Sequence, residues 1–142
     1  MRSIVLLAII LMVSWPVHAQ PVTKCDMTNF LGLSKKMGFL THQEIMNFLL
    51  TFDDECQNNV EYSEWSNELL FEMLDNQTEL TVKTIAYETK SIERVAVLKN
   101  LEEPLHDRFN IKSIIAKVEK VKFNAEAKRE IVGRLKIADS RK

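Results

Sequence analysis

The sequence predicts an all-α fold of six or seven short antiparallel helices, held by one disulfide. Three observations lead to this prediction. Glycine and proline are rare, with three of each in 142 residues, so the tight turns that an all-β chain needs are scarce. Apolar residues recur at steps of three and four, and helix-capping residues precede several of these stripes. No repeat period is evident, so a compact bundle and a HEAT-like helical array are both compatible with the pattern.

Residues 1–19 have the three parts of a secretory signal peptide. Arg2 gives a positive start, residues 4–13 are apolar, and residues 17–19 form a small-residue exit. The apolar run has about half of the roughly 20 residues that are needed to cross a bilayer. We therefore expect cleavage after residue 19, a single helical domain over residues 20–142 and no stable membrane anchor.

The remaining chain carries the helical pattern in seven segments. A capping box formed by Thr41 and Glu44 opens the second segment, and Asn110 and Asn124 are suited to cap the last two. Pro104 separates the fifth segment from the sixth. The expected helices are, in chain order, 28–37, 42–52, 61–74, 78–88, 91–101, 111–121 and 124–137.

The two cysteines of the mature part, Cys25 and Cys56, are expected to form one disulfide, because a secreted chain meets an oxidising compartment. In the chain-entropy model such a bridge stabilises the fold by about 3 to 4 kcal/mol. A redox-active pair would be a Cys-x-x-Cys, which is absent. The bridge is therefore interpreted as structural.

The charge is divided unevenly along the chain. Residues 20–80 hold eleven acidic and three basic residues, a net charge of −8, whereas residues 81–142 hold fifteen basic and nine acidic residues, a net charge of +6. No Lys or Arg occurs between Gly38 and Val82. The overall charge of −1 thus hides a dipolar molecule.

Five acidic residues of the third expected helix follow steps of three and four, so their like charges share one face at a local cost in stability. They are Glu61, Glu64, Glu68, Glu72 and Asp75. Three interpretations compete, and a metal site is the least favoured of them. The face is solvated or is neutralised by the basic half of the chain, or it is a docking surface for a cationic partner.

The expected partner-binding residues combine this helix with the acidic loop that precedes it, which the disulfide would hold rigidly. They are Asp53, Asp54, Glu55, Glu61, Tyr62, Glu64 and Glu68. Trp65 is expected in the core, since aromatic residues at helical spacing are more often buried. No metal site is expected, because the acidic loop lacks the ligand spacing of a calcium loop.

Catalytic and nucleic-acid-binding functions find little support in the residues. His42 lies inside the capping box, His106 lies beside Asp107 in a link, and no nucleophile, zinc or cofactor motif is present. The basic C-terminal half is interrupted by acidic residues and is poor in aromatic ones, unlike a nucleic-acid surface. We therefore expect no enzyme, no cofactor and no nucleic-acid partner.

These observations predict a non-catalytic periplasmic protein that binds a cationic protein through its acidic face, as an inhibitor or immunity-type protein does. The chain would be secreted if its source is not a Gram-negative bacterium. Two alternatives stay open: a periplasmic chaperone or stress protein, and a carrier of an apolar ligand with a cavity beneath Phe48, Leu69 and Met73. The oligomeric state is not predicted.

Overall fold

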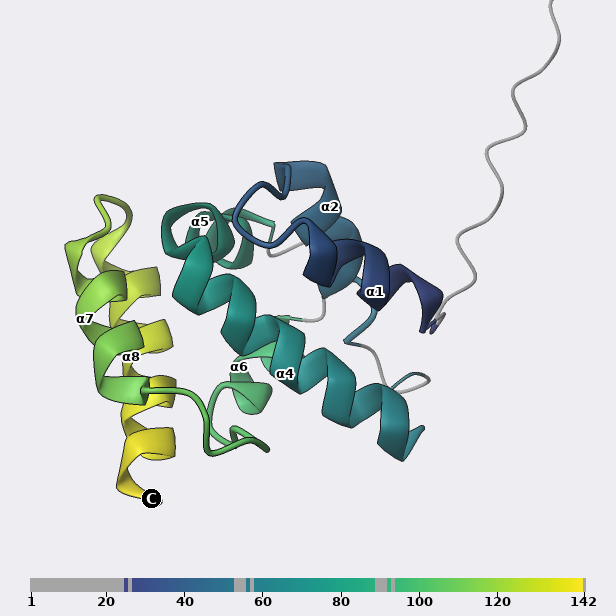
Figure 1. Cartoon of the computed structure of the whole chain (residues 1–142). Helices are drawn as coiled ribbons and strands as arrows, with labels where there is room; N and C mark the ends of the chain where they lie inside the picture. The colour runs from purple at the N-terminus through teal and green to yellow at the C-terminus, as the bar shows by residue number, and fades with distance from the viewer. Residues whose placement is uncertain are drawn as a thin grey trace, which may run out of the picture.

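The computed structural model describes residues 25, 27–52, 56, 58–88, 92 and 94–141, and all regular structure in these residues is α-helical (Figure 1). The helices are α1 (Thr28–Lys35), α2 (His42–Leu49), α4 (Val60–Asn76), α5 (Thr78–Tyr87), α6 (Arg94–Asn100), α7 (Ile111–Lys120) and α8 (Ala125–Ser140). The predicted fold class is confirmed. The signal peptide expected over residues 1–19 lies outside the described residues.

The predicted helix starts are confirmed where a side chain makes the cap. The Thr41 hydroxyl accepts from the backbone N–H of Glu44, and the Glu44 carboxylate accepts the Thr41 N–H at 2.8 Å, which completes the capping box. Asn110 caps α7 and Asn124 caps α8. The sequence did not single out Asn59, whose side chain accepts the N–H of Tyr62 and starts α4.

Two of the helices end two or three residues earlier than predicted. α1 stops at Lys35 instead of residue 37, and the chain then turns through Gly38, whose φ of 90° lies in the left-handed region that favours glycine. α2 stops at Leu49 instead of Phe52, and the Thr51 hydroxyl donates to the carbonyl of Phe48 at 2.7 Å. Phe52 is nevertheless fully buried, so the apolar pattern identified a core residue beyond the helix end.

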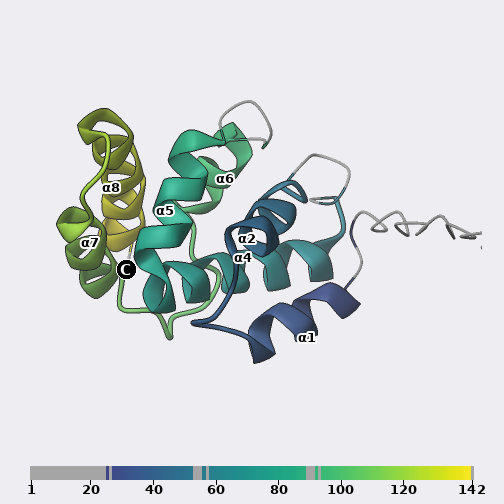
Figure 2. The same ribbon diagram turned by 90° about the horizontal axis from the view of Figure 1, so that it is seen from above.

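α5 lies at the centre of the fold and packs against α2, α4, α7 and α8. Figure 2 shows α7 and α8 side by side at one edge, with α1, α2 and the start of α4 toward the other. The core fills the space between them with fully buried residues from six helices, among them Leu49, Leu70, Ile85, Val97, Ile114 and Ile131. α4 is the element that spans the molecule.

The disulfide and an aromatic cluster hold the beginning of α4 in place. Cys25 and Cys56 are bonded, with their Cα atoms 5.3 Å apart, as predicted. The ring of Phe30 lies 4.7 Å from that of Tyr62 and 5.9 Å from that of Phe48. These contacts join α1, α2 and α4 near the disulfide, so the first turns of α4 are fixed by apolar packing as well as by a covalent bond.

Two amides, neither of them predicted, connect segments that are distant in sequence. The Gln77 side chain donates to the carbonyl of Leu40 at 2.5 Å and accepts its N–H at 3.0 Å, which joins the α1–α2 link to the α4–α5 corner. The buried Asn67 side chain donates to the carbonyls of Asn100 and Glu103 and accepts the N–H of Leu105. Asn67 therefore holds the segment after α6 against α4.

None of the described helices has the length and apolar character that a bilayer-crossing segment requires. The disulfide is compatible with an oxidising compartment outside the cytoplasm.

Candidate partner-binding face

The five acidic residues predicted to share one face of α4 do lie on one helix, but they divide into two groups with different surroundings. Glu61 and Glu64 are exposed in its first turns, whereas Glu68, Glu72 and Asp75 are partly buried farther along. The division decides at which positions the acidic face of α4 is neutralised within the protein and at which it is left without compensation by a described residue.

The second group is neutralised within the protein. The Arg108 guanidinium bridges Glu68, at 2.5 Å, and Glu72. His106 Nε2 lies 3.4 Å from the Glu68 carboxylate. Lys117 of α7 donates to the Asp75 side chain at 2.5 Å and to its carbonyl oxygen at 2.8 Å. The basic half of the chain thus supplies the cations that compensate the crowding of like charges on α4.

The first group has no such compensation in the part of the chain that the structure describes. Neither the Glu61 nor the Glu64 side chain forms a hydrogen bond or an ion pair with any described residue. Asp53, Asp54 and Glu55, predicted to extend this group, lie outside the described residues. The free acidic end of α4, as the structure describes it, consists of Glu61 and Glu64.

The burial of Tyr62 and the burial of Trp65 are the reverse of what was predicted for each side chain. Tyr62, predicted to contact a partner, is 1% exposed and packs on Phe30, so it is unavailable to a partner in this fold. Trp65, predicted to be in the core, is 44% exposed, so that prediction is wrong. Trp65 follows Glu61 by four positions, which places both on one side of the helix. A large aromatic surface therefore accompanies the two free carboxylates.

The exposed cations without a described partner gather mainly on α7, α8 and their link. Five of these cations are Lys112, Lys120, Lys122, Arg129 and Lys136, and the other two are Lys35 of α1 and Lys99 of α6. The other described basic residues of α7, α8 and the turn after α8 are held internally. Lys117 pairs with Asp75, Arg134 with Glu102 and Arg141 with Glu103, and the Lys128 ammonium donates to the carbonyls of Glu119 and Val121. Internal pairing therefore leaves a surplus of cations at one edge of the fold, although the exposed Glu119 and Glu126 reduce it.

Two acidic residues away from this face have lowered pKa values. A hydrogen bond from the Lys36 ammonium, together with the bonds from Thr41, lowers the pKa of Glu44 to about 2. The Lys83 ammonium donates to Glu79 at 2.5 Å and lowers the pKa of that carboxyl. Both carboxylates therefore have a partner within the protein.

The two histidines of the helical domain lie in contacts between segments. His42 Nδ1 is 3.0 Å from the Thr84 hydroxyl and His42 Nε2 is 3.1 Å from the Glu88 carboxylate, which joins the start of α2 to the end of α5. His106 lies beside Glu68 on α4. Both rings thus connect elements of the fold.

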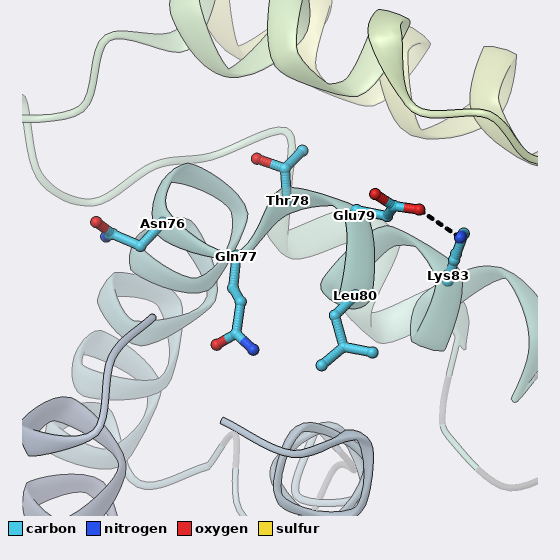
Figure 3. A pocket seen from close by; sticks show the side chains of 6 residues that line it. All are labelled: Asn76, Gln77, Thr78, Glu79, Leu80 and Lys83. Carbon is cyan, nitrogen blue, oxygen red and sulfur yellow. Dashed lines mark hydrogen bonds and ion pairs between the residues drawn. The ribbon is translucent and has the colours of Figure 1, made fainter. Parts of the chain in front are cut away.

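Three hollows of the surface are lined by largely polar residues. Figure 3 shows the one at the α4–α5 corner, lined by Asn76, Gln77, Thr78, Glu79, Leu80 and Lys83. A second lies between the loop after α6 and the end of α8, and a third lies between α4 and α6. None of the three is lined by Phe48, Leu69 or Met73, the side chains above the cavity that a carrier function would require.

Among the described residues, no group of three or more His, Cys, Asp or Glu side chains could hold a metal ion. The acidic residues of α4 are thus arranged along a helix and do not converge on a point.

No family model, no curated protein and no solved structure matches this chain.

Proposed function

We propose that this chain is a non-catalytic periplasmic protein that binds a cationic protein, as an inhibitor or immunity-type protein does, through the free acidic end of α4. The observation that carries the proposal is the pairing pattern on α4. Three of the five acidic residues on its acidic face are compensated by cations of the same chain. Glu61 and Glu64 are exposed and without a described partner, and they lie beside an exposed tryptophan.

This arrangement suits recognition for physical reasons. Exposed like charges steer an oppositely charged partner and speed its association. Tryptophan is over-represented among the residues that dominate interface energies, because it buries a large rigid surface at small entropic cost. The disulfide and the Phe30–Tyr62 contact hold the helix end in place. A rigid surface loses little conformational entropy when it binds.

The role of Asp53, Asp54 and Glu55 remains part of the proposal. These residues lie outside the described residues; they directly precede Cys56 in the sequence and carry three negative charges. Glu68 contributes less than the sequence suggested, because Arg108 and His106 already engage it.

The test uses affinity capture from the native envelope extract, at low and high salt, with the chain from Gln20 onward. The capture compares the wild type with E61K/E64K and with a control, E119K/D139K, which makes the same change of net charge on α7 and α8. We expect one stoichiometric partner that both the wild type and the control capture at low salt and lose at high salt. The amount captured by E61K/E64K should be at least tenfold lower.

Equal weakening by both double variants would show that overall charge is responsible, and it would refute this face as the binding site. Capture of many weakly bound clients would favour the chaperone alternative instead.

A further inference from the structure

Internal pairing leaves unpaired charge of opposite sign at opposite ends of the molecule. Figure 1 shows the start of α4 on the side of the fold away from α7 and α8, and Figure 2 shows the same separation in the perpendicular view. Glu61 and Glu64 belong to the first end. Five exposed cations without a described partner belong to the second: Lys112, Lys120, Lys122, Arg129 and Lys136. Two further ones, Lys35 and Lys99, lie on α1 and α6.

The middle of the molecule does not contribute to this polarity. There the cations of the C-terminal half reach the acids of α4: Arg108 meets Glu68 and Glu72, and Lys117 meets Asp75. The two charged halves of the sequence therefore neutralise each other only where they touch. Since the ends cannot reach each other within one chain, a second copy is the nearest source of compensation for both.

Apolar surface accompanies the charge at both ends. Val60 and Trp65 are exposed beside Glu61 and Glu64, and Ile137 is exposed on α8 near Lys136. Contact between the two ends would remove these side chains from water as well as pair the charges, and apolar burial supplies affinity that exposed ion pairs alone do not.

We propose that copies of this chain associate head to tail, the Val60–Trp65 end of α4 in one copy docking on the exposed basic surface of α7 and α8 in the next. The two surfaces differ, so the contact is heterologous and extends into short chains or a ring instead of closing as a two-fold dimer. This head-to-tail association needs no other protein, although a cationic partner would compete for the same end of α4.

The test is sedimentation velocity of the chain from Gln20 onward, at up to about 1 mM chain, in low salt and in about 0.5 M salt, where screening acts within a few ångströms. The wild type is expected to form species larger than a dimer in low salt and to dissociate in high salt. A wild type that stays monomeric at the highest concentration in low salt would overturn the proposal.

Two neutralised variants separate head-to-tail association from other modes. E61Q/E64Q keeps the basic surface, and a variant with Lys112, Lys120, Arg129 and Lys136 changed to Gln keeps the acidic end. Each variant alone is expected to be monomeric, while an equal mixture forms a 1:1 dimer, because one intact surface of each kind is then present. Self-association of E61Q/E64Q alone, or a mixture that stays monomeric, would overturn the proposal. Far-ultraviolet circular dichroism verifies that both variants keep their helices.

Discussion

The two halves of α4 carry the same pattern of acidic residues but lie in different electrostatic surroundings. In its second half, Glu68, Glu72 and Asp75 meet cations from the loop before α7 and from α7 itself. In its first half, Glu61 and Glu64 face solvent without a described partner, next to Trp65. An acidic face on one helix can therefore be neutralised in one half and left without compensation by described residues in the other, and tertiary contacts set the boundary.

Loss of the disulfide is expected to have the largest effect, because the bridge fixes the free end of α4. We expect C25A/C56A to lower the free energy of unfolding by about 3 kcal/mol, from the added entropy of the unfolded chain. Denaturant unfolding measures this, and hydrogen exchange should show faster opening at α1 and the start of α4 than at α7 and α8. Equal stability of the oxidised wild type and the variant would contradict this role.

Replacement of Asn67 tests the support of the paired half. Asn67→Ala removes the side chain that bonds to the carbonyls of Asn100 and Glu103 and to the N–H of Leu105. We therefore expect the free energy of unfolding to fall by about 2 kcal/mol. Asn76→Ala on the same helix is the matched control, because exposed Asn76 bonds only to the carbonyl of Glu72 and should cost under about 0.5 kcal/mol. Similar losses for the two variants would show that Asn67 has no special role.

Removal of the bridging guanidinium should take away the cation that two of the three acidic residues in the paired half share, while Asp75 keeps its ion pair with Lys117. Arg108→Gln leaves Glu68 and Glu72 with no ion pair to this side chain, and because Arg108 is half exposed we expect less than about 1 kcal/mol of lost stability. Association with a captured cationic partner should become faster, since two further carboxylates contribute to steering. An unchanged or slower association rate, measured by stopped flow, would contradict the idea that Arg108 masks part of the face.

The smallest expected effect is the contribution of Glu44 to the pH dependence of stability. Glu44 lies on α2, away from the acidic face of α4. Its folded pKa of about 2 is below the ordinary value of 4.5, so its bonds to Lys36 and Thr41 stabilise the fold above pH 4.5. This contribution is lost as the pH falls from 4.5 toward 2. Glu44→Gln should therefore show a shallower loss of stability across that window than the wild type does. Thermal unfolding between pH 2 and pH 7 makes the comparison, and parallel curves would refute the assignment.

Local features of the fold could be predicted from the sequence because they depend on neighbouring residues. Thr41, Asn110 and Asn124 cap helices that begin one position later, and this chemistry is complete within four residues. The disulfide was predictable because the sequence contains only two cysteines.

The content of the candidate site was predictable only in part, because it depends on which side of α4 is covered. Tyr62 and Trp65 are three positions apart, and only the placement of α1 decides that Tyr62 is buried against Phe30. The pairing of Glu72 with Arg108 joins residues 36 positions apart, and no spacing rule specifies it. The Gln77 and Asn67 contacts were missed for the same reason.

Quenching of Trp65 fluorescence tests the central claim, that the first half of α4 is a free acidic surface, without any knowledge of a partner. Trp15 lies in the expected signal peptide, so Trp65 is the single tryptophan of the chain from Gln20 onward. The local potential sets how well a cationic quencher, caesium, competes with an anionic one, iodide. If the first half of α4 is a free acidic surface, the ratio of caesium to iodide quenching is lower than in the wild type in E61Q/E64Q and higher in Arg108→Gln. The ratio is unchanged in the remote control E119Q/D139Q. A ratio that does not respond to E61Q/E64Q, or that responds equally to the remote control, would contradict the account.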